Sequence, residues 1–159
     1  ELTGLYNLRG LARRAREVGS QAFRHKEPLA CIVVTPMMGD QPQATEQVIE
    51  ELARILRATG RSSDVIGTLG PGEFAIVAGG TDSAGAERLA ERLADAAGRI
   101  FGGDDVRVAV GYDVVPNYSE SPIDPTDMLS RASAAMRRSQ QEAQYGRRLH
   151  LRRSTPTLN

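Results

Sequence analysis

The organisation of this chain is clearest in one stretch, Arg61-Ser62-Ser63-Asp64-Val65-Ile66-Gly67-Thr68-Leu69-Gly70-Pro71-Gly72-Glu73-Phe74-Ala75-Ile76-Val77. Two short apolar runs, residues 65–69 and 74–77, flank its Gly-Pro-Gly sequence. Glycine tolerates a positive φ and proline presets a turn, so these residues predict a strand, a tight turn and a second strand. Arg61 and Asp64 come just before the first of these strands. The stretch therefore predicts a hairpin with a charged pair at its entrance.

Apolar periodicity predicts two helices and a buried strand before this hairpin. Apolar residues recur at intervals of three and four in residues 8–22 and 48–56, which is typical of amphipathic helices. Between them lies Leu29-Ala30-Cys31-Ile32-Val33-Val34, which is apolar at every position and rich in β-branched residues. Such a run predicts a strand buried on both faces. We expect a loop over residues 35–45 and the end of the second helix at Gly60.

Four further segments follow the hairpin. The patterns predict helices in residues 86–97 and 128–136, a strand in 106–110 and a last, charged edge strand in 147–152. Residues 154–159 are expected to be disordered. The order α-β-α-β-β-α-β-α-β predicts an α+β palm: a mostly antiparallel five-stranded sheet with a β-α-β-β core, flanked by about four helices.

Composition narrows the class of protein. The 159 residues suffice for one domain with a core, and 20 basic residues balance 20 acidic ones, so charge does not favour nucleic-acid or membrane binding. The single cysteine, Cys31, lies in the apolar run, and we expect a buried, inert thiol. No apolar stretch approaches ~18 residues and no signal peptide is recognised. Because the chain opens directly on Glu1-Leu2-Thr3, we expect a piece of a longer protein.

Three segments resemble the GGDEF (diguanylate cyclase) family. Glu1-Leu2-Thr3-Gly4-Leu5-Tyr6-Asn7 is similar to the family's D-x-LTGLxNR opening, and Arg131-Ala132-Ser133-Ala134-Ala135-Met136 is similar to its R-A-D-x-A-M/L helix. Arg61-x-x-Asp64 stands five residues before Gly70, which is the spacing between the family's RxxD motif and its signature turn. The resemblance implies the same palm fold, and we expect a degenerate GGDEF domain over residues 1–153.

The resemblance also implies that the catalytic positions are changed. The family's metal-binding carboxylates fall at Thr35 and Gly72, and a hydroxyl is a poor substitute for a carboxylate on a hard cation. The second signature glycine is Pro71, which also removes an N–H group. Only Gln43 and Glu46 stand near the guanine-binding segment, and the family's triphosphate-binding Ala-Lys pair is Ser139-Gln140. Glu73 alone cannot assemble a two-metal site, so we expect no enzyme activity, no metal and no cofactor.

The RxxD motif is intact by this alignment. In the family it forms the inhibitory site (I-site) for cyclic di-GMP, which implies that Arg61 and Asp64 bind guanine. Arginine matches the O6/N7 edge with two donors, and aspartate accepts from the N1 and N2 hydrogens. The family's second arginine lies on the helix after the hairpin, where Arg92 is the best match and Arg88 the next.

We therefore expect a bacterial cyclic di-GMP receptor domain, cytoplasmic or in the cytoplasmic part of a membrane-associated protein. Its ligand would link it to a second copy or a neighbouring domain. The main alternative is a ligand-independent dimerisation or docking scaffold, in which Arg61 and Asp64 form an ordinary surface ion pair. A residual enzyme with an unorthodox site is the third. We expect no nucleic-acid partner and no membrane insertion.

Overall fold

The computed structural model describes residues 5–39, 44–102 and 106–151. The described residues form four helices and four strands in the order α1 (Leu8–His25), β1 (Leu29–Met38), α2 (Glu46–Thr59), β2 (Val65–Gly70), β3 (Glu73–Gly79), α3 (Ser83–Phe101), β4 (Val106–Val115) and α4 (Pro125–Leu151). Apart from its last predicted strand, the expected order of elements is confirmed.

The four strands form one antiparallel sheet in the order β2-β3-β1-β4. β1 lies between β3 and β4, and its residues 29–34 have no exposed surface, which confirms a strand buried on both faces. β1 continues to Met38 because β4 pairs with it along its whole length, from Leu29 opposite Val115 to Met38 opposite Val106. The expected loop from Thr35 was therefore wrong at its start: pairing with β4 extends the strand beyond the apolar run.

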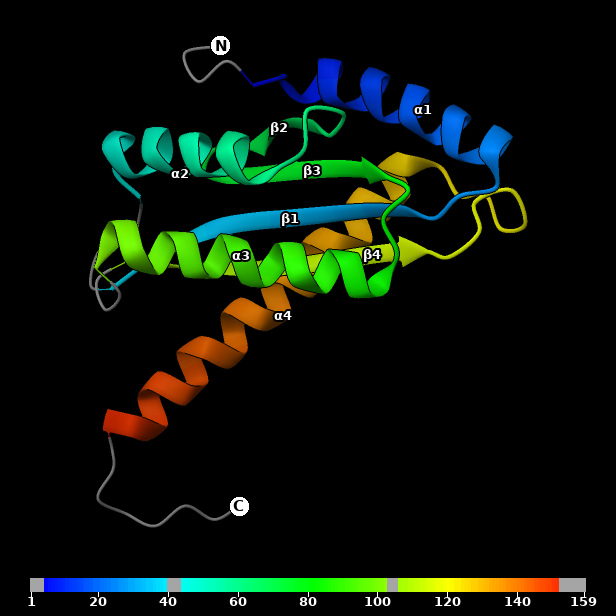
Figure 1. Cartoon of the computed structure of the whole chain (residues 1–159). Coiled ribbons are helices and arrows are strands. Elements are labelled where there is room, and N and C mark those ends of the chain that lie inside the picture. The colour runs from blue at the N-terminus through cyan, green and yellow to red at the C-terminus, as the bar shows by residue number, and fades with distance from the viewer. Residues whose placement is uncertain (1–4, 40–43, 103–105, 152–159) are drawn as a thin grey trace.

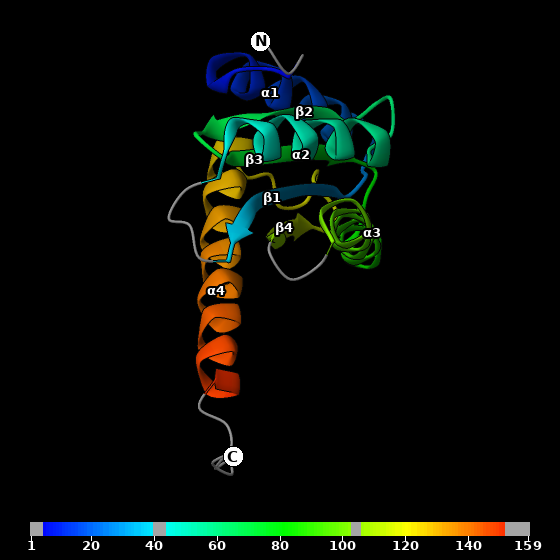
Figure 2. The same cartoon turned by 90° about the vertical axis from the view of Figure 1, so that its left-hand side faces the viewer.

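Helices cover both faces of the sheet (Figures 1 and 2). α1 and the first half of α4 pack on one face, and α2 and α3 pack side by side on the other. α4 lies directly against the backbone of the sheet at Gly111 of β4. A Cβ atom at that position would lie only 2.1 Å from the backbone nitrogen of Met136 and 2.5 Å from the carbonyl oxygen of Ala132. A side chain at residue 111 would therefore push α4 off the sheet.

Short polar residues begin three of the helices. The side chains of Asn7, Thr45 and Asp82 each accept a hydrogen bond from the backbone N–H three residues on, at 2.9, 3.2 and 2.9 Å. Such caps satisfy N–H groups that have no partner within the helix. Gly60 ends α2, as predicted. The cap residue of α3, Asp82, directly follows Thr81, whose hydroxyl accepts a hydrogen bond from Arg61.

The hairpin has the predicted tight turn. Gly70 pairs with Glu73, so Pro71 and Gly72 are the two central turn residues. Gly72 has φ of 72°, a conformation that glycine adopts readily. Proline followed by a glycine of positive φ is the pattern of a type II turn.

The predicted fifth strand is wrong. Residues 147–151 belong to α4, which runs unbroken from Pro125 to Leu151. Beyond Met136 this helix projects away from the sheet (Figure 2). Its last residues are therefore not placed to pair with an edge strand. A short alternating run cannot by itself distinguish a strand from the end of a helix. Residues 1–4 of the opening motif, the boundary at residue 153 and the tail 154–159 lie outside the described residues. None of the described helices is long and apolar enough to cross a membrane.

Candidate functional site

The loop between α2 and β2 is closed by Asp64. The carboxylate oxygen Oδ2 of Asp64 accepts a 2.9 Å hydrogen bond from the backbone N–H of Arg61. The backbone N–H of Asp64 donates in turn to the carbonyl oxygen of Arg61 at 3.0 Å. These two bonds bring the motif's two residues together, and the Asp64 side chain is only 2% exposed.

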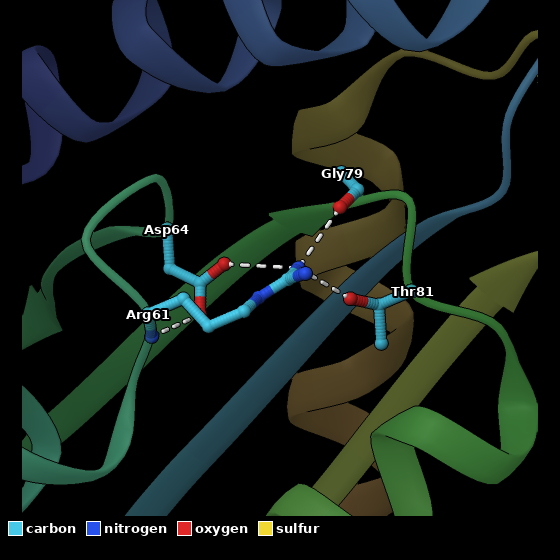
Figure 3. Close-up of polar contacts among 4 residues, drawn as sticks. All are labelled: Arg61, Asp64, Gly79 and Thr81. Atoms are coloured by element: carbon cyan, nitrogen blue, oxygen red, sulfur yellow. Dashed lines mark hydrogen bonds and ion pairs between the residues drawn. The ribbon is translucent and has the colours of Figure 1, made fainter.

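The guanidinium group of Arg61 crosses from this loop to the connection between β3 and α3 (Figure 3). Its Nη2 donates to the carbonyl oxygen of Gly79 at 3.0 Å and to Oγ1 of Thr81 at 2.8 Å, and lies 3.4 Å from Oδ1 of Asp64. Within the described part of the chain, Nε and Nη1 of Arg61 have no acceptor, and the side chain is 54% exposed. Arg61 thus braces two loops while most of its donors remain free for a ligand.

The other two predicted residues lie on α3. Arg88 and Arg92 are one helical turn apart and both are exposed. Neither makes a hydrogen bond or ion pair with another described residue. Together with Arg61 and Asp64 they line one pocket of about 310 Å³, whose full lining is Arg61, Asp64, Gly80, Thr81, Asp82, Gly85, Arg88, Leu89 and Arg92. The structure therefore brings all four predicted site residues to the same cavity.

The pocket is lined by donors that suit an anion and by two carboxylates, Asp64 and Asp82, that suit a donor-rich group. Three arginines surround it, and the N-terminus of α3 adds the positive end of a helix dipole. Asp82 caps α3 through Oδ1, and Asp64 contacts Arg61 through both of its carboxylate oxygens. Arginine forks and a buried acceptor together suit a ligand that carries both phosphate and a base with N–H groups.

The residues at the hairpin tip are tied to their neighbours. The hydroxyl of Thr35 donates to the carbonyl oxygen of Gly72 at 2.8 Å. Oε2 of Glu73 accepts from Oγ of Ser133 at 2.6 Å and lies 3.8 Å from Nη2 of Arg137. Both contacts join elements far apart in the sequence, and Glu73 faces α4.

The structure describes three of the four other positions that were considered from the sequence. Glu46 is exposed at the first position of α2, and Gln43 lies outside the described residues. Ser139 and Gln140 are half-buried on α4. Across the described residues, no group of three acidic, histidine or cysteine side chains is arranged to hold a metal ion.

Several contacts were missed by sequence reasoning. Residues 79–83 were interpreted only as a loop and a helix cap, yet Gly79 and Thr81 are the acceptors of Arg61. Ser133 was noted only for its place in a helix motif, yet it holds Glu73. No local pattern could have identified these partners, which are 18 to 60 residues distant in sequence.

A second polar group, formed by Asp113 and Arg131, lies between the sheet and α4. Asp113 of β4 stands opposite Cys31 of β1, and its Oδ2 has no hydrogen-bond partner among the described residues; the nearest cation is Nε of Arg131 at 3.8 Å. Burial raises the pKa of Asp113, and the charge of Arg131 offsets only part of that rise. Burial, with a smaller contribution from Asp113, raises the pKa of Cys31 to about 12, so the thiol is protonated at neutral pH.

Helices on both faces of a β2-β3-β1-β4 antiparallel sheet, with a tight β2–β3 hairpin at one edge, define an α+β palm. The chain belongs to the GGDEF-like domain family, whose model matches residues 4–120. Domains of this family are typically diguanylate cyclases. A comparison with curated protein sequences gave no significant match.

Solved structures share this fold. The GGDEF domain of YfiN (TpbB) from Pseudomonas aeruginosa superposes with a TM-score of 0.75 at 24% identity, covering 88% of this chain and 92% of that one. The GGDEF domain of DgcB from Caulobacter crescentus, solved with c-di-GMP, has a TM-score of 0.74 at 15% identity, covering 90% and 87%. The diguanylate cyclase SiaD from P. aeruginosa, solved with its activator SiaC, has a TM-score of 0.74 at 24% identity, covering 89% and 57%. At these identities the likeness is one of fold.

Proposed function

We propose that this domain is a catalytically inactive receptor for cyclic di-GMP, with its RxxD residues as the binding site. The observation that carries the proposal is the meeting of Arg61, Asp64, Arg88 and Arg92 around one pocket. They come from a loop and a helix that are separate in the sequence. The ligand seen with the DgcB domain has the two features that this pocket suits, phosphate and guanine.

Binding would require a small rearrangement of Arg61. Its Nη2 must exchange at least one of its present acceptors for the guanine edge, while Oδ1 of Asp64 becomes available to guanine N–H groups. The exchange is feasible because the Arg61 side chain is half exposed and uses only one of its nitrogens. Arg88 and Arg92, free of ion pairs with described residues, would meet the phosphates.

The hairpin tip supports the proposed loss of catalysis. A two-metal phosphoryl transfer needs carboxylates at the positions of Thr35 and Gly72 in the family pattern. Thr35 instead uses its hydroxyl to bind the Gly72 carbonyl oxygen, and Glu73 is turned toward Ser133 and Arg137. These contacts hold the hairpin in place without leaving an anionic cluster for Mg²⁺.

The proposed output is a change in what the ligand-bearing surface contacts. A bound cyclic di-GMP would present its outer face to a second copy of the domain or to a neighbouring domain of the same protein. Such contacts would favour one arrangement of the larger protein over another. The proposed setting is the cytoplasm of a bacterium.

Isothermal titration with cyclic di-GMP, beside GTP plus Mg²⁺, tests the proposal. We expect saturable binding of the cyclic dinucleotide and no cyclic di-GMP formed from GTP above a no-protein control. Arg61→Ala should abolish or strongly weaken binding. Arg13→Ala is the matched control, because Arg13 is exposed on α1, on the opposite face of the sheet. No binding at tens of micromolar ligand, or equal loss in both variants, would contradict the receptor role; product from GTP would contradict the inactivity.

One observation favours the alternative of a docking scaffold. The present contacts of Arg61 and Asp64 already complete a structural bracket between two loops. In a scaffold, the only role of Arg61 and Asp64 would be to hold these two loops together. A partner protein bound equally with and without cyclic di-GMP, and insensitive to Arg88→Ala, would favour that alternative.

A further inference from the structure

A second cavity adjoins the RxxD pocket. It has a volume of about 340 Å³ and lies between the end of α2 and the second half of α3, two helices that pack side by side (Figure 1). Its lining is Ala58, Thr59, Arg92, Asp95, Ala96 and Arg99. Arg92 belongs to both cavities, so they follow one another along α3.

The polar side chains of the second cavity are available. Asp95 and Arg99 are exposed, one turn apart on α3, and neither makes a hydrogen bond or ion pair with another described residue. Arg92 and Arg99 are seven positions apart, so they lie on one stripe of the helix, roughly 10 Å apart along its axis. A carboxylate and a guanidinium therefore face the second cavity, as Asp64 and Arg61 face the first.

The RxxD pocket alone is small for the proposed ligand. Its volume of about 310 Å³ lies at the lower end of the roughly 300–1,000 Å³ typical of small-molecule sites. A cyclic dinucleotide carries two purines, two riboses and two phosphates. The proposed function gives the first pocket one guanine and its phosphate, which leaves the second guanine in need of further space.

We infer that the second cavity is a subsite for the second guanine of the same ligand molecule. Asp95 accepts from its N1 and N2 hydrogens, Arg99 donates to its O6 and N7, and Arg92 lies between the two bases beside a phosphate. The two halves of the symmetric ligand thus meet two carboxylate–arginine pairs on one chain. The inference rests on the proposed function, because it adds a subsite for the second guanine of the ligand proposed for the RxxD pocket. It predicts that one cyclic di-GMP molecule binds to each chain.

Titrations with whole and half ligands test this subsite. Arg99→Ala and Asp95→Asn should weaken cyclic di-GMP binding about tenfold or more, the size of losing one bidentate base contact. 5′-GMP, a single guanine nucleotide, can occupy either subsite, so these variants should remove one of its two sites and leave its affinity for the RxxD pocket unchanged. Arg61→Ala should weaken both ligands. Glu87→Gln, an exposed α3 change that lines neither cavity, is the matched control for Asp95→Asn.

Base selectivity gives a second readout. Because aspartate only accepts hydrogen bonds, the wild type should bind cyclic GMP-AMP about tenfold or more weakly than cyclic di-GMP. Asp95→Asn should narrow that difference, because an amide can serve both bases. If Arg61→Ala abolishes binding while Arg99→Ala and Asp95→Asn match the wild type, the subsite is wrong and the receptor function stands. If the wild type binds no cyclic di-GMP, both are wrong.

Discussion

Replacing Arg61 by lysine separates the two roles that this side chain has in the structure and in the proposal. As a brace, Arg61 donates through Nη2 to Gly79 and Thr81. As a ligand-binding residue, it must present two parallel donors to a guanine edge. Lysine keeps the charge and can reach a single acceptor, but it has no planar fork.

The structure sets the size of each effect. Two exposed hydrogen bonds at about 0.5–1 kcal/mol each suggest that Arg61→Ala lowers the free energy of unfolding by about 1–2 kcal/mol. The ion pair with Asp64, 3.4 Å apart with Arg61 half exposed, adds little. Loss of a bidentate guanine contact is worth about 1–3 kcal/mol, or roughly 5- to 150-fold in affinity.

We therefore expect Arg61→Lys to recover most of the stability that Arg61→Ala loses and little of the affinity. Urea unfolding gives the first quantity and calorimetric titration with cyclic di-GMP gives the second. Arg13→Ala serves as the control in both. Full recovery of binding by Arg61→Lys would refute the argument from the guanidinium fork, and a stability loss below 0.3 kcal/mol in Arg61→Ala would refute the brace.

Three further predictions concern the sheet and what packs on it. Gly111→Ala should lower the free energy of unfolding by about 3 kcal/mol or more, because the new methyl meets the backbone of α4 at Met136; a loss under 1 kcal/mol in urea unfolding would mean that α4 shifts easily. Asp113→Asn should stabilise the domain at pH 7. Burial raises the pKa of Asp113, so its contribution to stability falls as the pH rises from the unfolded-state value of 3.8 through the folded-state value. The advantage of the variant should therefore vanish in thermal melts below pH 3.8, and an advantage independent of pH would contradict the assignment. Cys31 should react with a thiol reagent only in denaturant, because its raised pKa and complete burial leave neither thiolate nor access in the folded chain; fast labelling of the native protein would contradict this.

The sequence by itself determined the elements whose pattern is local. The apolar run of β1, the stripes of the helices and the Gly-Pro-Gly turn each depend on residues a few positions apart, so their types could be predicted. The spacing between Asp64 and Gly70 likewise identified the RxxD pair before any contact was known. The prediction of a last strand was wrong because it also relied on a local pattern. Residues 147–151 alternate in sequence, but they continue a long helix that leaves the sheet.

Only the tertiary structure decided what these elements contact. The placement of β1 between β3 and β4 lengthened it to Met38, since pairing with a neighbour extends a strand beyond its apolar residues. The brace from Arg61 to Gly79 and Thr81 depends on a loop that follows β3, and the cavity between α2 and α3 depends on how those helices pack. Such contacts join segments far apart in the chain, and hydrophobic spacing carries no information about which of them will meet.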